Sequence, residues 1–275
     1  MSNQAFLAAD GQLDGVEPGS LVTVDGDEGH HAVTVKRVRP GEGLDLLGGR
    51  GRRAAVTVAD VAKRSFTARV DRIVDEPGPG TRVVLVQALA KGDRDLQAVE
   101  AAVELGVSAV VPWQAERCVV RWGGEKTAKG RQKWESTVRS AVKQSRRAWI
   151  PEVGVPSTTA QLAATIGDPS VSGPLQSADP HGPSGSPRLV LVLHEAAAEP
   201  LTARVRAALQ DLEAGSSLGE VWLLVGPEGG ISEPEIETLR AAGALPAVLG
   251  RHVLRSGTAG PAALVLTRHL VGELD

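Results

Sequence analysis

The chain has 275 residues, of which 42% are hydrophobic and 23% charged, and its formal net charge is −3. These proportions are those of a soluble globular protein, and the length suits two domains of ordinary size. No apolar run reaches the ~18 residues that a membrane span requires, and the N-terminal sequence lacks the basic and apolar regions of a secretory leader. We therefore expect a cytoplasmic protein that does not contact a membrane.

The first part of the chain has the pattern of short strands separated by turns. Apolar or alternating segments predict strands at residues 21–24, 43–49, 54–61 and 65–74. A helical stretch, EGHHAVTVKRVR at 28–39, interrupts them. The Pro and Gly residues of EPGPGT at 76–81 suit neither a helix nor a strand. The sequence therefore predicts a small β-rich domain at residues 1–76.

From Arg82 onward, buried apolar strands alternate with helices, as they do in parallel βαβ units. Strands are predicted at 83–89, 108–113, 189–195, 220–226 and 244–250. Helices are predicted at 95–106, 200–215, 232–243 and 259–272, with a further long helix that ends at 147. Residues 168–187 are rich in Ser, Pro and Gly, which predicts a flexible insertion. Residues 77–275 are therefore expected to form an α/β domain.

Positive charge is concentrated in one part of the chain. Between Trp113 and Trp149 there are ten Lys or Arg against three Glu, a net charge of +7, and four of the five tryptophans lie in the same window. Basic side chains interleaved with aromatic ones suit phosphates and stacked bases, so this window is a candidate RNA contact. A solvated helix with buried tryptophans explains the pattern equally well.

Cysteine and histidine patterns give no support for a metal site. The single cysteine, Cys118, excludes an intrachain disulfide and any multi-cysteine zinc or iron–sulfur site, and a buried structural thiol is expected. His194 and Glu195 begin an H-E-x-x-H pattern, but Ala198 stands where the second histidine ligand would be. We expect no bound metal.

The most informative segment is VWLLVGPEGGISEPEIETL, in which a buried strand leads through a glycine-rich turn into a helix. Such a turn follows the carboxyl end of a strand, where open α/β sheets bind ligands. The glycines at 226, 229 and 230 would let the backbone approach a ligand, and Ser232 and Glu235 have the spacing of a capping box. Neither G-x-G-x-x-G nor a phosphate loop occurs, so NAD and ATP are disfavoured as ligands.

A second glycine-containing stretch, LGRHVLRSGTAGPAAL at 249–264, leads into an apolar final helix. Arg255, Ser256 and Thr258 stand at the expected N-terminus of this helix, where the two hydroxyls could cap free N–H groups. The positive end of a helix could also hold a carboxylate, such as that of a methionine-containing cofactor. The sequence leaves both roles open.

Six segments in the same order resemble the ribosomal RNA small subunit methyltransferase E family, a branch of the SPOUT methyltransferases. They are GDEGHHAVTVKRVRPGE, KGDRDLQAVEAAVELGVSAVVPWQAERCVV, AVKQSRRAWIPEV, LVLHEA, LLVGPEGGISEPEIE and LGRHVLRSGTA. The resemblance implies an N-terminal PUA-like β-barrel that grips RNA and a C-terminal SPOUT α/β domain with a trefoil knot. It also implies a homodimer that transfers a methyl group from S-adenosylmethionine to N3 of a uridine in 16S rRNA of the small ribosomal subunit.

The family pattern also implies functional residues. The cofactor would be bound by Leu193, His194, Glu195, Gly226, Pro227, Glu228, Gly229, Gly230, Leu249, Gly250, Leu254, Arg255, Ser256, Thr258 and Ala259. Uridine N3 carries a proton, so we consider Arg255 as stabiliser of the anionic base and Glu228 as general base. RNA phosphates would be bound by Arg37, Arg39, Arg52, Arg53, Lys91, Arg94, Arg117, Arg121, Lys143, Arg146 and Arg147.

The chain departs from the family pattern at two positions. Gly257 lies where the family often has a glutamate, so no carboxylate is available there, and Arg146 replaces a residue that is commonly small. The extra charge of Arg146 should strengthen RNA contact. Two alternatives stay open: a SPOUT methyltransferase that modifies another RNA position, and a noncatalytic RNA-binding homologue.

Overall fold

The computed structural model describes residues 3–168, 171, 173–175, 187–213 and 215–274. The chain forms two compact units. The N-terminal unit contains Met1–Gly78 and Val142–Ile150, and the C-terminal unit contains Pro79–Ala141 and Pro151–Asp275. Most of the expected insertion at 168–187 lies outside the described residues.

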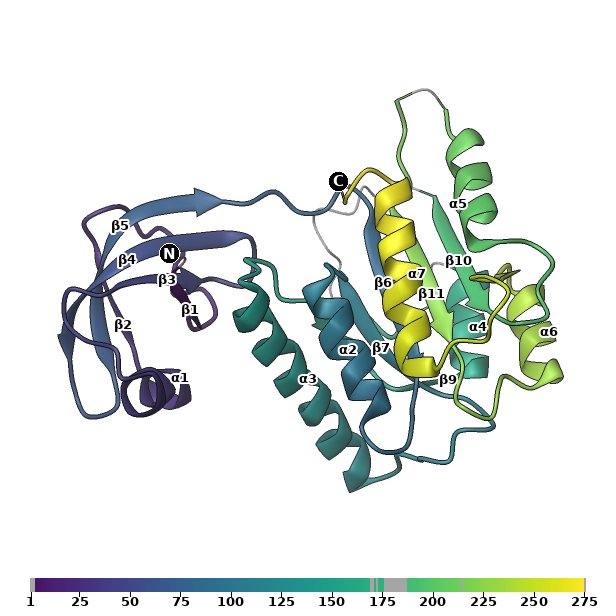
Figure 1. Cartoon of the computed structure of the whole chain (residues 1–275), viewed down its shortest axis with the longest axis horizontal. Coiled ribbons are helices and arrows are strands. Elements are labelled where there is room, and N and C mark those ends of the chain that lie inside the picture. Colours follow the sequence, from purple (N-terminus) through teal and green to yellow (C-terminus); the bar gives the residue numbers. More distant parts are fainter. Residues whose placement is uncertain (1–2, 169–170, 172, 176–186, 214, 275) are drawn as a thin grey trace. The chain divides into compact units, whose positions relative to one another are not determined.

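Five strands form the sheet of the N-terminal unit (Figure 1). They are β1 (Gln4–Leu7), β2 (Leu21–Val24), β3 (Gly43–Leu47), β4 (Arg52–Val61) and β5 (Phe66–Asp75), in the order β1-β3-β4-β5-β2. Buried side chains alternate along β4 and β5, and Phe6 and Phe66 meet edge to face at 5.8 Å in the core. Among the described strands no pairing joins β1 to β2, so the sheet is an open half-barrel.

The helix expected at 28–39 is confirmed with shifted ends. It begins as α1 (Gly26–His30), continues as a π-helix, η1 (His31–Lys36), and ends where Arg37 adopts a left-handed φ of 56°. Gly29 is required here, because an added Cβ would lie 2.5 Å from the carbonyl oxygen of Val24 and 2.7 Å from that of Arg64. The helix therefore lies directly against the turn between β4 and β5.

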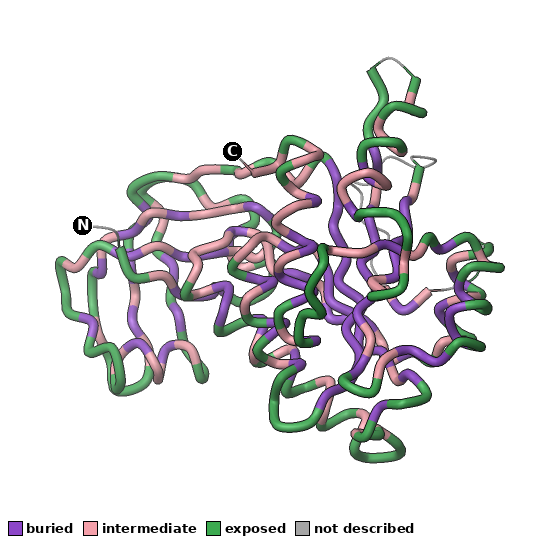
Figure 2. Tube along the Cα trace, turned by 45° about the vertical axis from the view of Figure 1, so that its right-hand side comes forward, coloured by how far each residue is buried: buried purple, intermediate pink, exposed green. Residues whose placement is uncertain are grey.

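The C-terminal unit is built on a parallel sheet, which confirms the α/β prediction. Its strands are β6 (Arg82–Ala88), β7 (Ala109–Gln114), β8 (Glu152–Val153), β9 (Ser157–Thr158), β10 (Arg188–Leu193), β11 (Glu220–Val225) and β12 (Leu245–Ala247). The order is β12-β10-β11-β6-β7-β8, and β9 also pairs with β7. All residues of β6 are buried, because this strand lies in the middle of the sheet between β11 and β7 (Figure 2).

Helices connect these strands and cover the sheet. They are α2 (Arg94–Glu104), α3 (Glu125–Ser145), α4 (Thr159–Gly167), α5 (Leu201–Gln210), α6 (Glu233–Ala241) and α7 (Ser256–Leu270). Helix α7 packs on α2, β6 and β11, whereas α4 packs on α6. An added Cβ at Gly260 would lie 2.8 Å from the Leu85 side chain, so α7 sits directly on the sheet. No helix among the described residues is both long and apolar enough to cross a bilayer.

The amino ends of the central strands are joined by a charged network. Glu220 accepts from Arg82 at 3.0 Å, from Arg188 at 3.1 Å and from the indole nitrogen of Trp222 at 3.0 Å. The Arg188 guanidinium also lies over the Trp222 ring, 5.0 Å from its centroid. Each charged group in this network therefore has a partner of opposite charge.

Candidate functional site

A pocket opens at the carboxyl ends of β10 and β12 in the C-terminal unit. It is lined by Leu193, His194, Glu195, Ala247, Val248, Leu249, Gly250, Arg251, His252, Val253, Leu254 and Ala259. The space outside protein atoms is ≈540 Å³, part of it open to solvent. The pocket therefore has the place of a ligand site in an open parallel sheet.

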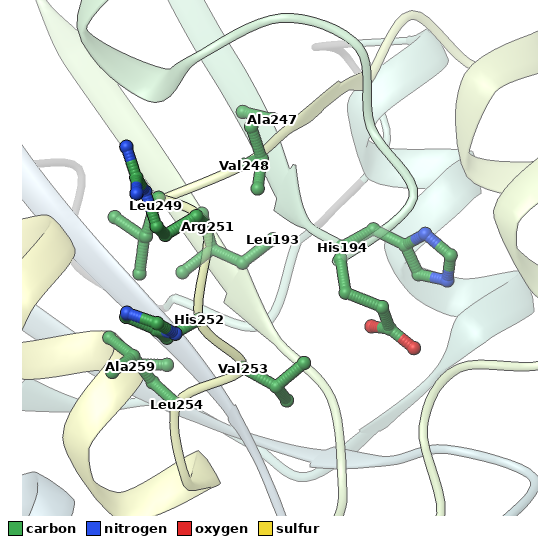
Figure 3. A pocket seen from close by; sticks show the side chains of 12 residues that line it. Leu193, His194, Ala247, Val248, Leu249, Arg251, His252, Val253, Leu254 and Ala259 are labelled. Atoms are coloured by element: carbon green, nitrogen blue, oxygen red, sulfur yellow. The ribbon is translucent and has the colours of Figure 1, made fainter.

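Strand register brings the lining residues together. Leu193 at the end of β10 pairs with Ala247 of β12, and the His194 amide donates to the Ala247 carbonyl at 3.0 Å. Figure 3 shows the stretch from Ala247 to Leu254 passing along one side of Leu193, with His194 on the other. Two stretches more than fifty residues apart thus form one wall because their strands are neighbours.

The lining combines apolar and polar groups. Leu193, Leu249 and Ala259 supply apolar surface, whereas His194 and Arg251 can donate hydrogen bonds. An added Cβ at Gly250 would meet no heavy atom within 4 Å, so the backbone there borders open space. Such a lining suits an adenosyl group, whose base is flat and whose ribose is polar.

Seven of the residues expected to bind the cofactor line this pocket: Leu193, His194, Glu195, Leu249, Gly250, Leu254 and Ala259. The other eight do not line it: Gly226, Pro227, Glu228, Gly229, Gly230, Arg255, Ser256 and Thr258. Sequence reasoning missed Arg251, His252 and Val253, although they lie inside the LGRHVLRSGTA segment that it singled out. Ala247 and Val248 were missed because an apolar strand end carries no chemical signal.

The glycine-rich loop after β11 lies beside the pocket, since Val225 pairs with Leu193. Its glycines are needed for contacts within the chain. A Cβ at Gly226 would lie 2.5 Å from the Ile231 side chain, one at Gly229 would lie 3.2 Å from that of Arg117, and Gly230 has a φ of 73°. Close packing accounts for Gly226 and Gly229, and the left-handed backbone accounts for Gly230, so none of the three needs a ligand to explain it.

Two arginines from neighbouring connections hold this loop. The Arg94 guanidinium lies 3.1 Å from the Glu228 carboxylate, and Arg117 donates to the Gly229 carbonyl at 3.2 Å. Both arginines were expected to bind RNA phosphates. In the structure each has a partner in the loop at 226–230.

The expected capping box at the start of α6 is confirmed. Glu235, which is buried, accepts from the Ser232 amide at 3.3 Å and from its hydroxyl at 3.1 Å. The same carboxylate accepts from the Glu116 amide at 2.9 Å and from the Thr159 hydroxyl. Glu235 therefore connects the glycine-rich loop to the loop after β7 and to the start of α4.

The N-terminus of α7 differs from the expectation that hydroxyl groups cap it. Arg255 occupies the N-cap position, and no side chain among the described residues caps this end. The Ser256 hydroxyl is buried without a hydrogen-bond partner, and Thr258 is exposed. Capping by Ser256 or Thr258 is therefore wrong, because both residues lie in the first turn of the helix, after its N-cap Arg255.

Several basic residues expected to contact RNA are held by acidic partners in the N-terminal unit. Arg53, whose side chain is 21% exposed, lies 3.3 Å from Asp45 and 2.7 Å from Glu76. Arg52 pairs with Asp75 at 3.6 Å, and Lys143 pairs with Glu28 at 3.0 Å. Arg37 and Arg39 are exposed, whereas Arg146 is partly buried and its left-handed φ of 56° follows the end of α3.

The burial of the tryptophans distinguishes the two interpretations of the basic stretch between Trp113 and Trp149. Trp113 is fully buried and donates to Thr159 at 3.1 Å, and Trp134 is 1% exposed. Neither can stack on a base, so for these two the buried-helix alternative is confirmed. Trp122 packs edge to face on Trp134, and Trp149 donates to the Glu76 carbonyl at 3.0 Å.

The remaining residues expected to bind RNA are Lys91, Arg121 and Arg147. Lys91 is exposed at the start of the loop before α2, Arg121 donates to the Glu116 carbonyl, and Arg147 is partly buried with a partner.

Cys118 is buried as expected, and burial raises the pKa of its thiol. No group of three or more metal-ligating side chains occurs in the part of the chain that the structure describes.

Comparison with known proteins gives consistent matches over nearly the whole chain. The family profile described as "RNA methyltransferase domain" matches residues 77–268, and that described as "RNA methyltransferase PUA domain" matches residues 24–71. The ribosomal RNA small subunit methyltransferase E of Mycobacterium bovis is 40% identical over 94% of this chain and 90% of its own. The protein of the same name from Bacillus subtilis is 27% identical over 89% and 88%.

Solved structures agree with these relatives. A Legionella pneumophila protein with the cofactor SAM bound has a TM-score of 0.77 and 27% identity, covering 98% of each chain. A ribosomal RNA small subunit methyltransferase E from Neisseria gonorrhoeae, bound to S-adenosyl methionine, has a TM-score of 0.75 and 25% identity, again over 98% of each chain.

Proposed function

This chain belongs to the ribosomal RNA small subunit methyltransferase E family, and we propose that it methylates N3 of one uridine in 16S rRNA. It is an S-adenosylmethionine-dependent rRNA methyltransferase, as its homologues and cofactor-bound structural neighbours indicate. The choice of uridine N3 is the proposal. The pocket at the carboxyl edge of the parallel sheet is the observation that most supports methyl transfer, because it would offer a place for the cofactor.

For the cofactor we propose all fifteen residues expected from the sequence, in two groups. The seven that line the pocket would enclose the adenosyl part, with apolar surface from Leu193 and Leu249 and donors at its rim. Arg251 and His252 join this group on the same grounds. The eight in the glycine-rich loop and at the start of α7 would contact the remainder. When bound, the cofactor supplies an electrophilic methyl group.

The protein's own contribution to the chemistry would be to orient the uridine toward the methyl group and to remove the proton from N3. Uridine N3 must lose its proton before it can act as a nucleophile at neutral pH. We propose that the Glu228 carboxylate accepts this proton and that the Arg255 guanidinium stabilises the negative charge on the base. Both residues are near the carboxyl edge of the sheet, and both side chains are accessible to solvent.

We propose that residues 1–76 form a PUA-like domain that binds RNA, and that the half-barrel of this domain is part of a PUA-like β-barrel. Residues 77–275 would then form the SPOUT domain. The PUA profile supports the first part of this division. Exposed Arg37, Arg39 and Lys91 are the basic residues best placed to contact phosphates, since their side chains face solvent. We further propose a trefoil knot in the C-terminal domain, a homodimer and a cytoplasmic location.

The test is methyl transfer to small ribosomal subunits from a strain that lacks this modification. The purified protein is incubated with S-adenosylmethionine labelled in its methyl group, and the RNA is digested to nucleosides. Label in 3-methyluridine is the expected result. Label in another nucleoside would keep the enzyme class but refute the target atom. Cofactor binding without label in RNA would indicate a noncatalytic RNA-binding homologue, which the glycine at 257 would then explain.

A further inference from the structure

Three connections of the C-terminal unit converge on Arg94. Arg94 is the first residue of α2, and its guanidinium lies 3.1 Å from the carboxylate of Glu228 in the glycine-rich loop. The first turn of α7 contacts the same residue through backbone, because a Cβ at Gly257 would lie 3.1 Å from the Arg94 carbonyl oxygen. Arg94 is therefore in contact with the candidate base and with the helix that carries Ala259 to the pocket.

The rest of the glycine-rich loop is fixed by other contacts. Gly229 is held through its carbonyl by Arg117, and Ser232 is held by the carboxylate of Glu235. Within the part of the chain that the structure describes, the Glu228 carboxylate pairs with Arg94 and with no other group. Arg94 therefore holds the loop at Glu228, and the ion pair determines the direction of that side chain.

Exposure argues against a purely stabilising role for the pair. The side chains of Arg94 and Glu228 are 46% and 31% exposed, and ion pairs this accessible contribute ~0–1 kcal/mol to folding. A proton acceptor, by contrast, must be held within hydrogen-bond reach of the atom it deprotonates, so a fixed direction has a large effect on rate. The pair is weak as a source of stability and well suited to orient a carboxylate.

We propose that Arg94 is a positioning residue that orients Glu228 to take the proton of uridine N3, an inference that rests on the proposed function. In that step the N3–H bond breaks, the proton moves to a carboxylate oxygen of Glu228, and the electron pair stays on N3 as the nucleophile. The proton is released to water afterwards. Arg94 acts only through Glu228 and binds neither the base nor a phosphate.

The test compares four variants with the wild-type protein. Arg94→Met removes the charge at similar side-chain length, and Arg94→Lys keeps the charge. The exchange R94E together with E228R restores an ion pair but moves the carboxylate to position 94. Arg206→Met, at an exposed position of α5, is the matched control for the loss of one positive charge.

Four quantities are measured for each variant: kcat and KM for ribosomal subunits, the Kd for S-adenosylmethionine by calorimetry, and amide hydrogen exchange of residues 226–232 in the cofactor-free protein. We expect Arg94→Met to lower kcat at least about 10-fold, with KM and Kd within about threefold of wild type, since general-base catalysis contributes ~10²–10⁴-fold. Its loop amides should exchange faster. Arg94→Lys should recover most of kcat, and Arg206→Met should leave kcat unchanged.

The exchanged pair separates positioning from structure. If Arg94 orients a catalytic carboxylate, R94E/E228R should restore slow exchange in the loop but not kcat. Recovery of kcat in that double variant, or a wild-type kcat in Arg94→Met, would refute the inference. A wild-type protein that labels no RNA would refute the proposed function instead, and unchanged exchange in Arg94→Met would then refute the orienting contact by itself.

Discussion

The two ends of the parallel sheet in the C-terminal unit differ in how their polar groups are satisfied. At the amino ends of β6, β10 and β11, Glu220 is matched by two arginines and an indole nitrogen. At the carboxyl ends, β10 and β12 border the pocket, β12 leads to the uncapped N-terminus of α7, and β11 leads into a loop held by partly exposed arginines. One end is closed by its own side chains, and the other leaves donors and space for a ligand.

This difference suggests that stability and ligand binding are separated along the length of each strand. Substitutions at the amino end should change the free energy of unfolding and leave cofactor affinity nearly unchanged. Substitutions at the carboxyl end should do the reverse. Each prediction below tests one side of that separation.

The largest effect on stability is expected from Glu220→Ala. The variant leaves Arg82 and Arg188, whose side chains are 11% and 27% exposed, without their carboxylate, and removes the acceptor of Trp222. Breaking a largely buried charge network should lower the free energy of unfolding by ~2–4 kcal/mol. Urea denaturation measures this loss, and calorimetry should give a Kd for S-adenosylmethionine within about threefold of wild type. A loss below about 1 kcal/mol would show that the network is not needed for stability.

The opposite behaviour is expected from Gly250→Leu. Because a Cβ at Gly250 meets no atom within 4 Å, the new side chain should enter the pocket without straining the fold. We expect S-adenosylmethionine to bind at least ~10-fold more weakly, or ~1.4 kcal/mol, at an unchanged unfolding midpoint. Gly123→Leu is the matched control, since that glycine also borders open space but lies outside the pocket. Equal affinity in the two variants would place the cofactor elsewhere.

A smaller effect on stability is expected from Arg268→Met. Arg268 lies near the end of α7 and donates to the carbonyls of Leu105 at 2.7 Å and Glu273 at 2.8 Å, so it closes the end of α2. Loss of these two bonds should cost ~1–2 kcal/mol in urea denaturation. Cofactor affinity should not change, and a clear decrease would mean that this contact influences the pocket.

The smallest effect concerns Asp95, a buried carboxyl group in the first turn of α2. Burial raises its pKa, and hydrogen bonds from nearby backbone amides oppose this only in part. A carboxyl with a raised folded pKa binds its proton more tightly in the native state, so stability falls as pH rises from the unfolded value through the folded one. The Tm of Asp95→Asn should therefore lose this part of its pH dependence and equal or exceed that of wild type at pH 7. A lower Tm at pH 7 would show that the charged form is stabilised overall.

Long apolar or periodic segments made most of the fold predictable. The strand at Arg82–Ala88 and the helix at Glu233–Ala241 were expected within one or two residues. The strand is buried on both faces and the helix on one face, and each arrangement leaves a clear pattern of apolar residues in the sequence. Strands β1, β8 and β9 were missed since they have two to four residues and depend on distant partners. Helix α4 was missed as well, although Thr158 and Gln161 form a capping box there.

The sequence identified the segments that form the candidate site, but it did not predict how those segments are arranged in space. The stretches at 193–195 and 249–259 were identified, yet only strand register determines that Leu193 and Ala247 are neighbours. The tryptophan pattern was misleading for Trp113 and Trp134, because spacing in the sequence does not tell which side chains turn inward. Glu235 was expected only as a cap, since no local pattern reveals that Glu116 and Thr159 also donate to it.

The position of β6 has a consequence for synthesis of the chain. This strand is completed at Ala88, but β11, its partner on one side, begins at Glu220, about 130 residues later. At ~5–20 residues per second, one edge of a strand that is fully buried in the folded protein waits on the order of 10 s for its neighbour. During that time the nascent chain has an open edge that another chain could pair with, so we expect the yield of folded protein to depend on chaperones that cover it.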